Sequence, residues 1–134
     1  MRTLDPPDPK LWRARGEWFW RAHDANAGPH ALELGPRASA LLDEVELAFS
    51  AGAWAAVVIL AWTIVEAEQR AIERASDAPH EAPDVDWLRE RRNALIHIGG
   101  AQDERAPPDE AELKAIAEGA VRVVFKTLFA GAWK

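Results

Sequence analysis

The apolar stretch at residues 53–65 constrains the fold more than any other part of the chain. Thr63 is its only polar residue, and helical spacing continues from there to residue 75. A strand of that length would be abnormal in a globular protein, and the apolar run is too short to span a bilayer. A helix that is apolar on every side is normally enclosed by other helices. We therefore expect residues 53–75 to form the buried central helix of a bundle.

Two further segments have the one-sided apolar spacing of helices that pack on such a centre. The segment at residues 38–50 has a stripe made of Leu41, Leu42, Val45, Ala48 and Phe49. The segment at residues 109–130 has a core stripe made of Leu113, Ile116, Ala117, Ala120, Val124, Thr127 and Leu128. It also has another apolar side, made of Val121, Phe125 and Phe129. Two apolar sides predict a second neighbour for this last helix, often from another subunit.

The N-terminal region is rich in tryptophan. Helical spacing predicts a short first helix at residues 10–24, weakened by Gly16, and a loop at residues 25–36, which contains two Gly-Pro pairs. Trp18 and Trp20 fall on different sides of that helix. One aromatic side is expected in the core, and the other either joins the core or meets a partner chain.

The prediction for the whole fold is an all-α, up-down bundle of four long helices plus the short N-terminal one. The length fits a single domain at residues 1–134. Residues 1–9 contain three prolines and are expected to be an extended tail. Residues 99–108, which read GGAQDERAPP, are expected to be a flexible loop that acts either as a lid or as a linker.

Composition excludes several classes of function. The chain has no cysteine, so it has no disulfide, no thiolate metal site and no cysteine nucleophile. Its histidines are scattered without metal-ligand spacing, at His23, His30, His80 and His97. We therefore expect no metal site and no cofactor. The net charge of -6 argues against broad, nonspecific binding of nucleic acid. The polar, proline-rich start is unlike a signal peptide, and no membrane association and a cytoplasmic location are expected.

Residues 84–100, which read DVDWLRERRNALIHIGG, are expected to form one further helix, with Asp84 as N-cap and a stop at Gly99 and Gly100. Its apolar stripe is made of Val85, Leu88, Leu95 and Ile96. Arg92 falls in the middle of that stripe, where a guanidinium needs a carboxylate, backbone carbonyls or a ligand phosphate. A second stripe holds Asp86, Glu90, Asn93 and His97. The alternative is a structural role for Arg92 and a solvated face for His97.

Other charged residues are candidates for supporting roles around Arg92. Arg89 and Arg91 lie close to it in sequence and are predicted to form a local basic patch that binds RNA. Glu66 ends the buried half of the central helix. It is expected either to reach Arg92 and orient it, or to pair with Arg70 on the surface at the i,i+4 spacing.

These features together resemble the HEPN domains (higher eukaryote and prokaryote nucleotide-binding domains), most closely over residues 41–100. The family pattern is an arginine, a polar residue and a histidine after four to six intervening positions, which maps to Arg92, Asn93 and His97. The resemblance implies a metal-independent endoribonuclease in many members and a binding module in others. It also implies a homodimer. A tyrosine that is modified in some HEPN toxins corresponds to Gly99 here, so that form of control is not expected.

The residue types suit cleavage of single-stranded RNA by its own 2′-hydroxyl. His97 exchanges protons near neutral pH, Arg92 holds the scissile phosphate, and Asn93 supplies a hydrogen bond. Two copies of the motif in one cleft would supply both a base and an acid. A toxin or antiphage defence role, with an antitoxin or another partner protein, is compatible with this hypothesis. The alternatives are a catalytically silent HEPN module that binds a nucleotide or a partner protein, and a plain helical dimerisation domain.

Overall fold

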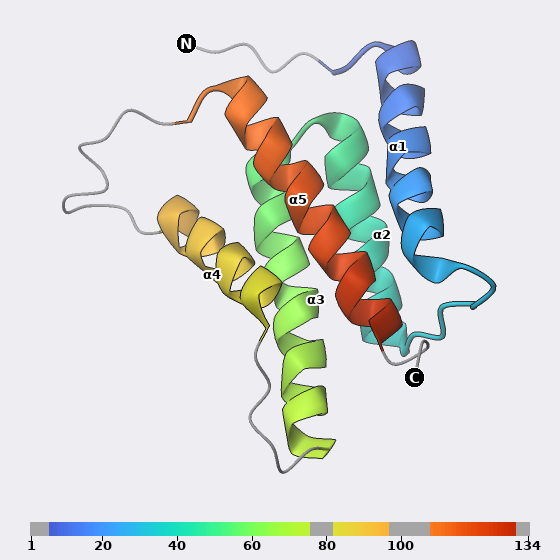
Figure 1. The fold of residues 1–134 in the computed structure, drawn as a ribbon. Helices are drawn as coiled ribbons and strands as arrows, with labels where there is room; N and C mark the ends of the chain where they lie inside the picture. The colour runs from blue at the N-terminus through green and yellow to red at the C-terminus, as the bar shows by residue number, and fades with distance from the viewer. Residues whose placement is uncertain (1–5, 76–81, 97–107, 131–134) are drawn as a thin grey trace.

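The computed structural model describes residues 6–75, 82–96 and 108–130, and in these residues it contains five helices and no strand (Figure 1). In chain order the helices are α1 (Pro9–Ala27), α2 (Pro36–Ala51), α3 (Trp54–Ala75), α4 (Pro83–Ile96) and α5 (Glu110–Phe129). The predicted all-α bundle is confirmed. Among the described residues, no helix is both long enough and apolar enough to cross a membrane.

Four of these helices form a closed bundle. α1 contacts α2, α2 contacts α3, α3 contacts α5, and α5 contacts α1 again. α4 lies outside this ring and packs against α3 and α5, as Figure 1 shows at the left of the molecule. One side of α4 therefore faces α3 and another side faces α5. The environment of each arginine on α4 depends on which of these two sides it occupies.

The first helix is a full member of the bundle and is not short. α1 has 19 residues, whereas α4 has 14. The Asp8 side chain accepts a hydrogen bond from the Lys10 backbone N–H, and Pro9 begins the helix at a position that suits proline. Phe19 is completely buried, and burial of this kind outweighs the low helix propensity of Gly16. The helix therefore continues three residues beyond its predicted end.

The connection between α2 and α3 is a tight turn. Gly52 has a left-handed conformation, with φ of 76°, and its N–H donates to the carbonyls of Ala48 and Phe49. A Cβ at this position would lie 2.8 Å from Nη1 of Arg15. The left-handed backbone conformation therefore calls for glycine, and a Cβ would also require the Arg15 guanidinium to move.

The second apolar side of α5 is covered by α1 of the same chain. Phe125 is fully buried, with edge-to-face contacts to Phe19 and His23 at 5.1 and 5.4 Å between ring centroids. Phe129 is also buried and contacts His23. The prediction that this helix has a second neighbour holds, but the neighbour is intramolecular. This side of α5 gives no argument for a second subunit.

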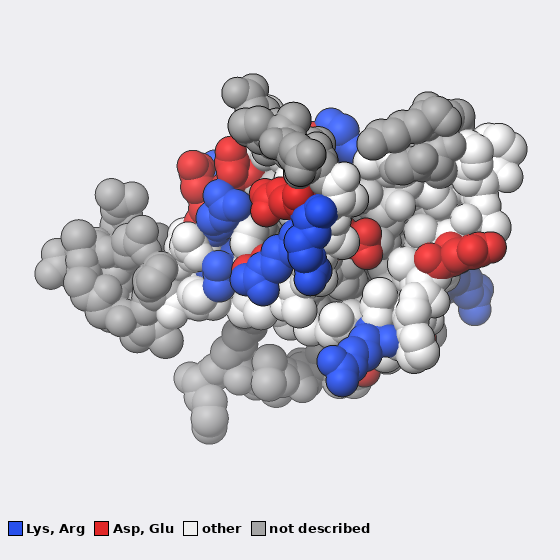
Figure 2. All heavy atoms as spheres, turned by 90° about the horizontal axis from the view of Figure 1, so that it is seen from below, with Lys and Arg blue, Asp and Glu red and all other residues white. Residues whose placement is uncertain are grey.

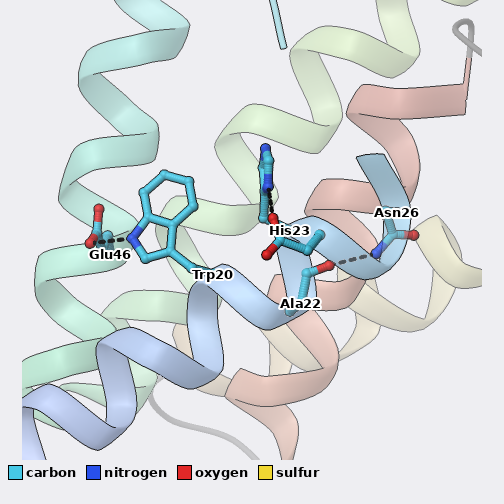
Figure 3. Close-up of polar contacts among 6 residues, drawn as sticks. Trp20, Ala22, His23, Asn26 and Glu46 are labelled. Atoms are coloured by element: carbon cyan, nitrogen blue, oxygen red, sulfur yellow. Dashed lines mark hydrogen bonds and ion pairs between the residues drawn. The ribbon is translucent and has the colours of Figure 1, made fainter. Parts of the chain in front are cut away.

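The two aromatic sides of α1 have different environments. Trp18 stacks on Phe49 in the core, with ring centroids 4.8 Å apart. Trp20 lies across the surface towards α2, where its Nε1 donates to Glu46 Oε1 at 2.9 Å, and 44% of the residue stays exposed (Figure 3). The central helix is also less enclosed than predicted, because Ile59 on α3 is 39% exposed.

Candidate functional site

The candidate site is built on α4, whose first residue is Pro83. The sequence places Asp84 outside the helix as its N-cap, but in the structure Asp84 lies in the first turn together with Asp86. Proline is favoured at a first helical position because its missing N–H has no intrahelical partner there. The negative charges of the first turn suit the positive end of the helix. The predicted stop at Gly99 and Gly100 lies outside the described residues.

The apolar stripe of α4 enters the bundle only in part. Val85 and Leu88 are buried, Leu95 is half-buried, and Ile96 is 41% exposed, contrary to the stripe expected from the sequence. The beginning of the helix is therefore anchored in the core, while its last turn lies at the surface. Arg92 occupies the transition between the two and is half-buried.

Arg92 points towards α3, where its guanidinium carbon lies 5.3 Å from the ring centroid of Trp62. The Nε of Arg92 is buried and has no hydrogen-bond partner in the part of the chain that the structure describes. Trp62 itself is only 5% exposed, and its Nε1 is likewise buried without a partner. The guanidinium therefore rests on an aromatic face, which attracts a cation, and no carboxylate among the described residues pairs with it.

Arg89 shares this aromatic ring. Its guanidinium carbon is also 5.3 Å from the centroid of Trp62, and it precedes Arg92 by three positions, so both lie on neighbouring parts of the helix surface. Arg89 additionally donates to Asp86 at 2.8 Å, in an exposed ion pair. Two positive groups consequently meet at one indole, and one of them is already partly neutralised.

Arg91 does not contact the ring of Trp62 that Arg89 and Arg92 share. Its guanidinium carbon lies over a different ring, that of Trp87, at 5.8 Å. Trp87 belongs to the side of α4 that faces α5, where its ring lies 2.6 Å from the place that a Cβ of Gly119 would occupy. The predicted basic patch is therefore divided between two sides of the helix.

Glu66 pairs with its own helix and not with the motif. Its carboxylate accepts from Arg70 Nη2 at 2.7 Å. This is the surface i,i+4 pair that the sequence offered as one of two alternatives. Trp62, one turn earlier in α3, occupies the place beside Arg92 that the other alternative gave to Glu66. The sequence contained a signal for it, a tryptophan in the last turn of the apolar run, but no indication of its partner.

Of the other two motif residues, the structure describes Asn93 but not His97. Asn93 is half-buried on α4 next to Arg92. His97 follows Ile96, the last described residue of the helix, and lies outside the described residues. Its proposed role therefore stays a prediction from the sequence.

Charges of both signs lie side by side on the surface. Figure 2 shows Lys and Arg side chains gathered beside Asp and Glu side chains at one end of the bundle, with no field of a single sign in that view. Two ion pairs also combine opposite charges: Arg70 with Glu66 on α3, and Arg89 with Asp86 on α4. An exposed ion pair of this kind contributes little to stability. Arg92 differs from both arginines because it has no ion pair within the described part of the chain.

Two other features lie on the far side of α4 and around α1. A cleft of about 510 Å³ separates α1, α4 and α5, and its walls include Trp87, Arg122, Lys126 and Asp84, the last two forming an ion pair. His23 contacts the Asp24 carboxylate at 2.9 Å (Figure 3). The described residues contain no cluster of three or more histidine or acidic side chains that could hold a metal ion.

Comparison of the chain with protein-family models, with curated proteins and with solved structures gives no match.

Proposed function

We propose that the chain is a HEPN-type, metal-independent endoribonuclease that cleaves single-stranded RNA. The observation that carries the proposal is the state of Arg92, which is half-buried, rests on Trp62 and has no carboxylate partner among the described residues. An arginine of this kind retains its charge and its donors for a phosphate. It also belongs to the helix that leads directly into His97. This position supports the role that the sequence motif implies.

The reaction assigns one task to each group. His97 accepts the proton of the ribose 2′-hydroxyl, whose oxygen then forms a bond to phosphorus. Arg92 stabilises the negative charge that develops on the phosphoryl oxygens, and Asn93 supplies a hydrogen bond to the substrate or to the imidazole. The bond from phosphorus to the 5′-oxygen breaks, and a second acid protonates that oxygen. The products are a 2′,3′-cyclic phosphate and a 5′-hydroxyl.

The first test is cleavage of a single-stranded RNA by the purified chain in EDTA. We expect cutting to continue in the chelator, because none of the groups above requires a metal ion. DNA of the same sequence should remain intact, because it lacks the attacking 2′-hydroxyl. An RNA that is cut only after a divalent metal ion is added would contradict the proposed mechanism.

The proposed active unit is a homodimer in which the second copy of His97 provides the acid. Two observations favour it. Arg92 faces α3, whereas the sequence spacing predicts a different side of the helix for His97, which lies outside the described residues. The two helices that hold Arg92 also expose apolar side chains, Ile59 and Ile96. Light scattering at micromolar concentration should give twice the chain mass, and a monomer at that concentration would count against the two-copy site.

The second candidate function is a catalytically silent HEPN module that binds a nucleotide or a partner protein. The pairing of Arg89 with Asp86 on α4 and the net charge of -6 favour it, because a nuclease that holds long RNA commonly has a more basic surface. Binding of RNA or of a nucleotide without any cutting would favour this function over the nuclease. A toxin or defence role with an antitoxin belongs to the first proposal and needs cutting.

A further inference from the structure

Trp62 is the residue that fixes the environment of Arg92. It projects from α3 towards α4 and is almost completely buried. The guanidinium groups of Arg89 and Arg92 both lie 5.3 Å from its ring centroid. Trp62 is enclosed, whereas Arg92 is half-buried where α4 leaves the core. We therefore take the ring as the fixed member of the contact and the guanidinium as the group that it holds.

The two arginines on this ring are not equivalent. Arg89 is exposed and is compensated by Asp86. Arg92 has its Nε buried without a partner, and no hydrogen bond or ion pair is found for it within residues 6–75, 82–96 and 108–130. A half-buried cation without compensation is unfavourable, so the attraction of the aromatic face is the main favourable contact that the described residues offer it.

The contact between Arg15 and Trp54 in the same bundle is a structural contact with which that of Arg92 and Trp62 can be compared. Trp54, two turns earlier in α3, is also buried, and the guanidinium carbon of Arg15 lies 4.8 Å from its ring centroid. Arg15, however, also donates through Nη1 to the Ser50 carbonyl at 3.3 Å. The Nε of Arg15 is also buried without a partner, but its Nη1 has a protein acceptor in addition to the indole. Within the described residues, Arg92 has the indole alone.

We propose that Trp62 is a positioning residue that holds the Arg92 guanidinium by a cation–π contact, so that its charge stays available to a phosphodiester. The proposal rests on the role of Arg92 in the proposed function. A carboxylate in the same place would hold the arginine equally well but would neutralise it and compete with the phosphate. An indole has no such effect, because it presents a π face without a formal charge. The sequence alternative in which Glu66 orients Arg92 is replaced by this arrangement.

The experiment measures positioning and binding without relying on cleavage. The probe is a single-stranded oligonucleotide with 2′-O-methyl sugars, which has phosphodiesters but no nucleophile. Nuclear magnetic resonance reports the Arg92 Nε–H signal, assigned by its loss in Arg92→Lys. In the parent protein we expect this signal to be displaced from that of a solvated arginine, because the guanidinium lies within the ring current of Trp62.

Trp62→Leu keeps an apolar side chain but removes the π face. We expect the Arg92 signal to move to the position of a solvated arginine and the oligonucleotide to bind about tenfold more weakly. Trp62→Phe keeps an aromatic face with weaker attraction for a cation, so it should retain the displaced signal and lose only about two- to threefold in affinity. The Phe variant also serves if the Leu variant fails to fold.

Trp54→Leu and Trp54→Phe are the matched controls. They remove an equally buried indole with its own guanidinium from the same helix, so they should lower the stability of the fold similarly. The Arg92 signal and the oligonucleotide affinity should stay at the parent values. If the Trp54 variants weaken binding as much as the Trp62 variants, general destabilisation explains the effect and the positioning role is wrong.

Two further results would overturn the proposal. One is a Trp62→Leu protein that keeps both the parent affinity and the parent Arg92 signal. The other is a parent protein that does not bind the oligonucleotide, since Arg92 would then have no phosphodiester to meet. A failure of the proposed nuclease gives a different result from both. In that case the parent protein binds the oligonucleotide but never cuts RNA. If Trp62→Leu still releases Arg92 and weakens binding, the positioning role stands.

Discussion

Replacing His97 by alanine is expected to reduce RNA cleavage by about 10²–10⁴-fold, the usual contribution of a general acid or base. The motif contains no other group that exchanges protons near neutral pH. Rates should be compared under single-turnover conditions, with circular dichroism and urea unfolding used to establish that the variant is as well folded as the parent. His30→Ala is the control, because His30 belongs to the connection between α1 and α2. Equal rates for His97→Ala and the parent would remove His97 from the mechanism.

The neighbouring motif residues should show graded losses in the same assay. Arg92→Lys is expected to be nearly as damaging as His97→Ala, because an ammonium lacks the planar fork that grips a phosphate and stacks less well on Trp62. Asn93→Ala should have a smaller effect, since it removes a hydrogen bond but no charge. A reversed order, with Asn93 more important than Arg92, would contradict the assigned roles.

Replacing Phe125 by alanine is expected to lower the free energy of unfolding by about 3–5 kcal/mol. Phe125 is completely buried in α5 and meets Phe19 and His23 edge to face. The variant loses both ring contacts and leaves a cavity at the junction of α1 and α5. For a domain whose total stability is about 5–15 kcal/mol, a loss of this size is a large fraction of the total.

Urea unfolding followed by circular dichroism measures this loss. Phe125→Leu keeps much of the volume and should cost under about 1.5 kcal/mol. Leu47→Ala changes a residue that is 51% exposed, and a surface substitution of this kind should stay within about 0.5 kcal/mol of the parent. An unfolding midpoint for Phe125→Ala equal to that of Leu47→Ala would mean that α1 does not cover α5 as described.

Local sequence patterns predicted most of the fold. The spacing of apolar residues located α2, α3 and α5 to within one or two residues, because each helix buries a regular stripe. The length of α1 was not predictable in the same way. Gly16 lowers local helix propensity, and only the packing of Phe19 and Trp18 against other helices restores the helix. Because the first helix was expected to be short, the sequence did not indicate that α1 packs against Phe125 of α5.

The candidate site was predictable only where it depends on neighbours in sequence. The Glu66 and Arg70 pair follows from a spacing of four residues along α3. The contact between Arg92 and Trp62 joins residues thirty positions apart and depends on the rotation and register of α4 against α3, which the sequence pattern does not define. For the same reason the sequence grouped Arg89, Arg91 and Arg92 into one patch, whereas the structure divides them between Trp62 and Trp87.

The most direct test of the account is the chemical identity of the ends that the purified chain produces from a single-stranded RNA in EDTA. Mass spectrometry of the fragments resolves a 2′,3′-cyclic phosphate from a 3′-phosphate and from a 3′-hydroxyl. Attack by the 2′-hydroxyl, with Arg92 on the phosphate and His97 moving the proton, predicts cyclic phosphates paired with 5′-hydroxyl ends. Intact RNA, or fragments with 3′-hydroxyl and 5′-phosphate ends, would contradict it.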